Sequence, residues 1–119
     1  MTNTFYDEFG APKAYIEDDG NIFLFNGECV GYVLKDSVYS FSGKHLGFFK
    51  DGWIRDFDGK CVVFIKTAKR GPERRVMDIG RVKDPKSIIP VKQPRESSSR
   101  VLEVKDEWSE LTFVQFYNQ

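Results

Sequence analysis

The chain has 119 residues and a mass of 13.8 kDa, which allows one domain with a single hydrophobic core. Its 18 Lys and Arg residues balance 18 Asp and Glu residues, so no overall charge draws it toward nucleic acid or an acidic membrane surface. No signal peptide and no apolar run of about 18 residues is present, which favours a cytosolic protein without a membrane partner. We therefore expect Cys29 and Cys61 to be reduced thiols.

Glycine marks a repeat in the first half of the chain. Each unit reads as a β-hairpin, in which two runs rich in Phe, Tyr, Ile and Val flank a turn. Asn26-Gly27 and Asp58-Gly59 predict two-residue turns of type I′, which need positive φ at both positions. The first unit departs most from the pattern, with Glu8 and Phe9 before its glycine. The four turn glycines recur at intervals of 17, 16 and 16 residues: Gly10, Gly27, Gly43 and Gly59.

Four such hairpins must pack together, because a single hairpin is marginal in water. Radial closure removes long exposed strand edges, whereas an ordinary eight-stranded barrel or meander is the alternative. We predict an all-β fold in which four hairpin repeats of about 16 residues form a closed, flower-like arrangement over residues 1–68. A crowded centre is indicated by the small residues at the fourth position after each turn glycine: Ala14, Gly31, Gly47 and Val63.

The second half of the chain has a different composition. Residues 69–100 contain four prolines and ten Lys and Arg against four Asp and Glu, with no aromatic residue. We expect a basic linker that is extended or disordered, attracted weakly to the acidic hairpins. Residues 101–119 are apolar enough to dock back as a C-terminal segment. In that segment Thr112 would cap a helical turn through Tyr117, and Trp108 and Phe116 would plug the hairpin domain.

The run IFLFNGECVGYVLKDSVYSFSGKHLGFFKDGWIRDFDGKCVVFI, residues 22–65, resembles the bacterial 4-fold beta flower domain. The ending WSELTFVQFY, residues 108–117, is similar to the ending of such chains. The resemblance covers the first 68 residues and implies hairpins arranged around an approximate four-fold axis. That family carries no assigned activity, so the resemblance implies a fold and no catalytic residue.

The third and fourth hairpins offer candidate binding residues. Trp53 stands outside the hairpin pattern beside the Asp51-Gly52 turn, so we expect it to be exposed. Tyr39 belongs to an aromatic stripe that would either stack a flat ligand or form the core. We favour a non-enzymatic module that binds a protein partner or a small ligand through its hairpin loops. Its candidate binding residues are Trp53, Arg55, His45 and Tyr39.

An enzyme is the second hypothesis. Cys29, His45 and Cys61 each lie two residues after a turn glycine, so on a four-fold ring they would present a ligand set that zinc accepts. His45 is also the only histidine available for acid–base chemistry near neutral pH. The spacing lacks the pairs of known zinc modules, and no hydrolase or phosphate-loop motif is present. We therefore expect no resident cofactor, and we expect Asp56 to be solvated and Asp58 to be a turn residue.

A nucleic-acid-associated protein is the third hypothesis. Basic residues of the linker would contact phosphate, but no aromatic residue lies among them to stack a base, which disfavours sequence-specific recognition. Closed repeats favour a monomer over a homodimer, although hairpin edges can also pair. The candidate basic patch consists of Arg70, Arg74, Arg75 and Arg81.

Overall fold

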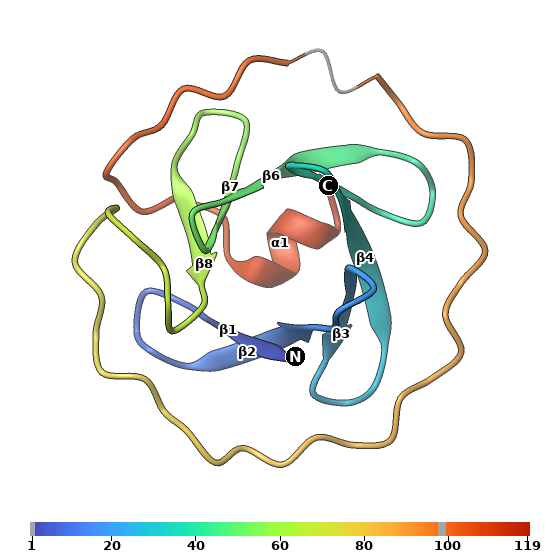
Figure 1. The fold of residues 1–119 in the computed structure, drawn as a ribbon, viewed down its shortest axis with the longest axis horizontal. Coiled ribbons are helices and arrows are strands. Elements are labelled where there is room, and N and C mark those ends of the chain that lie inside the picture. Colours follow the sequence, from blue (N-terminus) through green and yellow to red (C-terminus); the bar gives the residue numbers. More distant parts are fainter. Residues whose placement is uncertain (1, 98–99) are drawn as a thin grey trace.

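The computed structural model describes residues 2–97 and 100–119, so residues 98 and 99 of the predicted linker lie outside the described part (Figure 1). Consecutive antiparallel strands form a closed barrel, in which β1 and β8 meet at Tyr6 and Phe64. The predicted all-β flower of four hairpins is confirmed; each hairpin is called a petal below. The strands of petals one to four are β1 (Asn3–Tyr6) and β2 (Pro12–Ile16), β3 (Asn21–Leu24) and β4 (Cys29–Leu34), β5 (Ser37–Tyr39) and β6 (His45–Lys50), and β7 (Trp53–Arg55) and β8 (Cys61–Phe64).

The turns at the petal tips differ from the predicted type. In the second petal the Gly27 amide donates to Leu24 O at 3.0 Å, so the turn spans four residues and ends on the glycine. Gly27 has φ 92°, but Asn26 is not in the left-handed region, so the prediction of a two-residue type I′ turn is wrong. The observed turn has one left-handed glycine, and the strand register shifts after it. Such a turn needs a positive φ only at that glycine. Between petals three and four, by contrast, Asp51 and Gly52 both have positive φ.

The hydrophobic core fills the centre of the flower. Phe5, Ile22, Val38 and Ile54 occupy equivalent positions in the four petals and are all buried there. The expectation of a crowded centre is confirmed at Gly47, because a Cβ on this residue would lie 2.2 Å from Arg55 O and 2.8 Å from Phe116 Cε1. Phe116 therefore packs where the third petal has no side chain.

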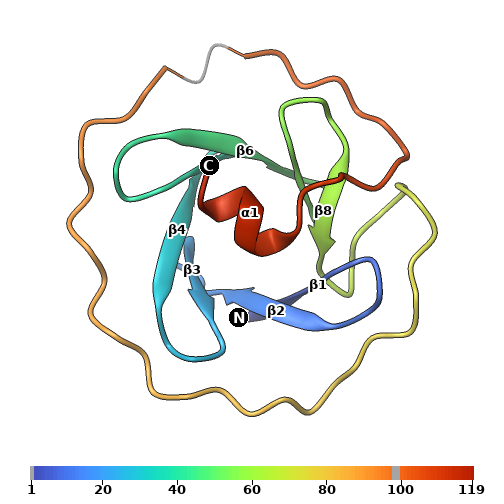
Figure 2. The same cartoon turned by 180° about the vertical axis from the view of Figure 1, so that it is seen from behind.

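The C-terminal segment closes the centre as predicted. Helix α1 (Phe113–Tyr117) lies within the ring of petals, and Thr112 caps it (Figure 2). Thr112 and Gln115 form a capping box, in which each side chain accepts from the other residue's backbone amide. Trp108 contacts the rings of Trp53 and Phe64, so both expected plug residues pack against the flower.

The basic linker circles the petals as an extended chain (Figures 1 and 2). Its amides donate to carbonyl oxygens at the petal tips, so we call residues 69–97 and 100–107 the belt. Four of these hydrogen bonds, one to each turn glycine, recur every nine residues of the belt, while the petals repeat every 16 or 17. The four bonds run from Asp78 N to Gly10 O, Ser87 N to Gly27 O, Glu96 N to Gly43 O and Lys105 N to Gly59 O, at 2.8 to 3.2 Å.

Among the described residues, no helix has the length and apolar character that crossing a membrane requires.

Candidate functional site

The four residues expected to form a binding surface are buried, and the belt contacts the side chains of three of them, Trp53, Arg55 and Tyr39. Trp53 is 0% exposed, because the belt crosses it: its Nε1 donates to Lys69 O at 2.9 Å and the Arg74 guanidinium lies over its ring. The expectation that Trp53 is exposed is therefore wrong. Arg55 is also buried and donates from Nη1 to Gly59 O and Lys105 O. A partner would reach these side chains only if the belt moved away.

His45 occupies a cage of aromatic rings. The centroids of Tyr39, Phe48 and Phe57 lie 5.1 to 5.2 Å from its own, and the side chain is fully buried. Neither ring nitrogen has a hydrogen-bond partner among the described residues. Burial holds the pKa of His45 below its usual value, and the nearby Gly47 backbone acts in the opposite direction. The imidazole is thus held neutral in an apolar site.

Cys29, His45 and Cys61 occupy equivalent strand positions, opposite Phe23, Tyr39 and Arg55, but the structure does not bring them together. Cys29 packs with Tyr15 and Phe23, whereas Cys61 packs with Tyr6, Trp53 and Phe64. In the described part of the chain, no group of three His, Cys, Asp or Glu side chains is placed to hold a metal ion. Burial raises the pKa of both thiols to about 11, so both are protonated at neutral pH.

The candidate basic patch faces the flower rather than solvent alone. Arg74 Nη1 donates to Ala68 O at 2.7 Å, and Arg81 Nη1 donates to Pro12 O at 3.0 Å. The guanidinium of Arg75 lies 5.4 Å from the ring centroid of Phe9. Arg70 supplies its carbonyl to Arg74 and has φ 62°. Three of the four guanidinium groups therefore bind petal rings or carbonyl oxygens of their own chain.

A cavity of about 280 Å³ lies between the first petal tip and the C-terminal segment. We call it the Phe9 cavity, because Phe9 is 63% exposed beside it and Val114 is also exposed. Its rim carries the exposed carboxylates of Glu8 and Glu110, for which no ion pair occurs among the described residues. Its other lining residues are Asp7, Lys13, Val62, Trp108, Ser109, Leu111, Thr112 and Phe113.

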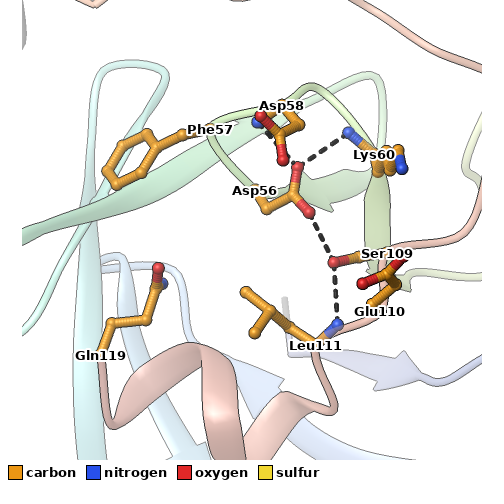
Figure 3. Close-up of a pocket in the computed structure, with 8 residues that line it drawn as sticks. All are labelled: Asp56, Phe57, Asp58, Lys60, Ser109, Glu110, Leu111 and Gln119. Atoms are coloured by element: carbon orange, nitrogen blue, oxygen red, sulfur yellow. Dashed lines mark hydrogen bonds between the residues drawn. The ribbon is translucent and has the colours of Figure 1, made fainter.

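A second cavity, of about 350 Å³, lies on the other side of the same loop, against the fourth petal tip (Figure 3). We call it the Asp56 cavity. The Ser109 hydroxyl donates to Asp56 Oδ2 at 2.5 Å and accepts from the Leu111 amide at 3.1 Å. The two cavities share Ser109, Glu110 and Leu111, so they flank the C-terminal loop. The remaining residues around this cavity are Phe57, Asp58, Lys60 and Gln119.

Asp56 is 6% exposed, so the expectation that it is solvated is wrong. Its Oδ1 accepts from the amides of Asp58 and Lys60 at 2.9 and 3.0 Å, as Asp7 accepts from Phe9 and Ala11 in the first petal. Asp58 lies in the turn, as predicted. Because Oδ2 also binds Ser109, the Asp56 carboxylate ties the C-terminal loop to the fourth petal.

Sequence reasoning did not select Phe9, Glu8 or Glu110 as site residues. The signal for Glu8 and Phe9 was their departure from the petal repeat, since a large apolar residue replaces the small polar residue of the other turns. Glu110 had no such signal, because its place beside two petal tips depends on the path of the belt.

One comparison with known proteins finds a matching family. The model of the 4-fold beta flower protein family matches residues 3–117, so the match includes the belt and α1 as well as the petals. No curated protein and no solved structure matches the chain significantly. The flower of four petals, the belt around it and the helix at its centre lie within one family match, and the chain belongs to the 4-fold beta flower protein family.

Proposed function

We propose that this protein is a small interaction module that binds a cationic, partly apolar segment of a partner protein beside its first and fourth petal tips. The observation that carries this proposal is the pair of cavities on the two sides of Ser109–Leu111. Both cavities are lined by hairpin turns, and one has the exposed Phe9 ring beside it. Exposed aromatic residues beside an apolar hollow are typical of protein-binding surfaces.

The charges around the cavities favour a cationic ligand. Asp7 is engaged, because its Oδ2 lies 3.8 Å from Lys13 Nζ and its Oδ1 accepts two amides. Glu8, Asp58 and Glu110, by contrast, have no ion pair among the residues that the structure describes, and all three are exposed. A Lys or Arg of a partner would meet these carboxylates at the rim, while an adjacent apolar side chain would enter the hollow.

The belt illustrates the mode of binding that we propose. It is an extended, basic stretch whose cations lie over petal rings and whose amides donate to petal carbonyls. The petal surfaces are thus able to hold an extended cationic chain. A partner segment at the cavities would use the same chemistry, cation against carboxylate or ring, beside the Phe9 ring, which is 63% exposed although the Arg75 guanidinium of the belt lies over it.

The proposal is tested by selecting ligands from a displayed library of random nine-residue peptides on the immobilised full chain. We expect the selected peptides to combine Lys or Arg with a neighbouring aliphatic or aromatic residue. Phe9→Ser and Glu110→Lys should each weaken their binding at least about tenfold, because each removes one of the two contacts. Leu34→Ser, at an exposed apolar position on β4, is the matched control and should leave binding unchanged.

Added salt should also weaken binding, because exposed charges are screened at high ionic strength. Peptides without a cationic preference, or binding that survives both Phe9→Ser and Glu110→Lys, would contradict the proposal.

A further inference from the structure

The belt contacts are separated by multiples of three residues. The belt amides that donate to petal tips belong to residues whose numbers differ by multiples of three. Three residues per turn is the period of the polyproline II helix, an extended conformation without internal hydrogen bonds. Every third residue of the belt therefore points in the same direction, so the belt has three faces. The donors are Asp78, Asp84, Ser87, Gln93, Glu96 and Lys105.

A second set of belt residues, one position before the donors, packs onto the petal rings. Lys83 Nζ lies 4.8 Å from the ring centroid of Tyr15, and Lys92 Nζ lies 4.4 Å from that of Tyr32. Lys86 lies over Phe23 and also pairs with Glu17. The members of this set that contact petal rings or their cluster are Arg74, Met77, Lys83, Lys86, Lys92 and Arg95.

The third set faces solvent and is apolar over seven consecutive turns. Ile88 is 92% exposed and Val91 is 81% exposed, values unusual for aliphatic side chains in an ordered segment. Neighbouring members are about 9 Å apart along such a helix, so they form a ridge rather than a single patch. We call this set the belt ridge: Val76, Ile79, Val82, Pro85, Ile88, Val91 and Pro94.

The positive charge of the belt determines which kind of protein surface can pack against the belt ridge. Residues 69–100 carry ten Lys and Arg against four Asp and Glu, so two belts placed side by side repel each other. The Phe9 cavity has the complementary character, since it is an apolar hollow whose rim carries the carboxylates of Glu8 and Glu110, which have no ion pair within residues 2–97 and 100–119. Its volume of about 280 Å³ is at the lower end for small-molecule sites and is large enough for aliphatic side chains.

We propose that the belt ridge of one molecule docks into the Phe9 cavity of a second copy of this chain. Ile88 and Val91 supply the apolar side chains, and the net positive charge of the belt around them attracts Glu8 and Glu110 of the other copy. This inference rests on the proposed function and names its ligand. The two surfaces differ, so the contact is heterologous, and a pair of molecules keeps one unused ridge and one unused cavity.

The extended belt is held in place before docking, so little backbone freedom is lost when the ridge binds. Because a heterologous contact leaves free surfaces at both ends, molecules are expected to join head to tail as their concentration rises. Charge attraction also predicts that added salt shortens these assemblies.

Sedimentation velocity of two complementary variants of the full chain tests this contact. The ridge variant carries Ile88→Asp and Val91→Asp, and the cavity variant carries Phe9→Ser and Glu110→Lys; all four positions are exposed. We expect the average mass of the unaltered protein to rise with concentration up to about 1 mM. Each variant alone should stay monomeric, because it lacks one of the two surfaces. An equimolar mixture of the variants should form one-to-one pairs, and Leu34→Asp should behave as the unaltered protein.

Other outcomes overturn the inference in ways that can be told apart. An unaltered chain that is monomeric throughout, while library peptides still bind the cavity, removes self-association and leaves the proposed function. Association of the cavity variant by itself would show that belts pair with each other. An unaltered chain that neither binds library peptides nor associates would contradict both the inference and the proposed function.

Discussion

Arg55 donates from Nη1 to the carbonyl oxygen of Lys105 at 2.6 Å, and this bond fastens the last part of the belt to the fourth petal. The same nitrogen donates to Gly59 O at 2.7 Å, at the tip of its own hairpin. Arg55 stands where the other petals carry Tyr6, Phe23 and Tyr39, so a buried cation replaces an aromatic ring at one position of the repeat.

Replacing Arg55 by Met, which keeps an unbranched apolar side chain, should lower the free energy of unfolding by about 1.5–3 kcal/mol. The loss arises because Lys105 O and Gly59 O lose a charged donor in a buried setting. Urea unfolding measures the change, with Lys44→Met at an exposed position as the control. An Arg55→Met protein as stable as the parent would show that the bond contributes nothing to holding the belt.

The belt register yields a second prediction. Inserting one Gly between Ile88 and Ile89 shifts the three-residue phase of everything that follows, so Gln93 N and Glu96 N no longer meet Phe41 O and Gly43 O. We expect faster hydrogen exchange at Gln93 and Glu96, by tenfold or more, with little change upstream at Asp78 and Asp84. Equal protection of the four amides in parent and insertion variant would mean that the belt bulges locally and keeps its register.

The petals could be predicted from the sequence because the repeat places residues of one kind at one position. Phe5, Ile22, Val38 and Ile54 share a place in the pattern and a place in the core. The belt path was not predictable in the same way, since backbone hydrogen bonds to the turn glycines hold it across 46 to 68 residues of sequence. A backbone hydrogen bond places no demand on side-chain type, so the three-residue pattern of the belt side chains does not show which petal tip each amide meets.

The residues of the candidate site likewise divide into those with a local sequence signal and those without one. Burial of Trp53 and His45 was missed because the belt, and not the petals, covers Trp53, and because three rings from different turns and strands enclose His45. Thr112 and Phe116 were placed correctly, because an N-cap and an apolar helical face are local signals. The Phe9 cavity needs two petal tips and the C-terminal loop together, which no local signal indicates.

The contact between the third petal and α1 predicts that Gly47→Ala is strongly destabilising. The new Cβ would lie 2.2 Å from Arg55 O and 2.8 Å from Phe116 Cε1, so the backbone or the helix must shift. Overpacking of this kind costs roughly 1–3 kcal/mol, which thermal unfolding would show as a lower Tm. Val114→Ala on the exposed side of α1 is the control. A Gly47→Ala protein with an unchanged Tm would show that α1 is not seated against this strand.

The two thiols should be unreactive in the folded protein. Burial raises the pKa of Cys29 and of Cys61 to about 11, so thiolate is scarce at pH 8 and access is blocked. Iodoacetamide at pH 8 should modify neither residue in the native state and both residues in urea, as intact mass measurements would show. Rapid native labelling of Cys61 would indicate that the belt opens, because Lys105 and Trp108 lie against this thiol.

The His45 cage predicts that the protein loses stability as the pH falls. Burial keeps the pKa of His45 below its usual value near 6.5, with Arg100 acting in the same direction and Glu96 against it. Below about pH 6.5 the unfolded chain therefore binds a proton that the folded chain does not, so the free energy of unfolding decreases. The slope is at most about 1.4 kcal/mol per pH unit, and it ends at the lower pKa of the folded state.

His45→Phe is the matched variant for this prediction, because a phenyl ring fills the aromatic cage and cannot take up a proton. Thermal unfolding should show a smaller fall in Tm between pH 7 and pH 5 for His45→Phe than for the parent. The Tm of each protein at pH 7.5 serves as its own reference. Other titratable groups are the same in both proteins, so their contribution cancels in the difference. Parallel pH profiles would show that the imidazole takes up its proton inside the cage as readily as in the unfolded chain.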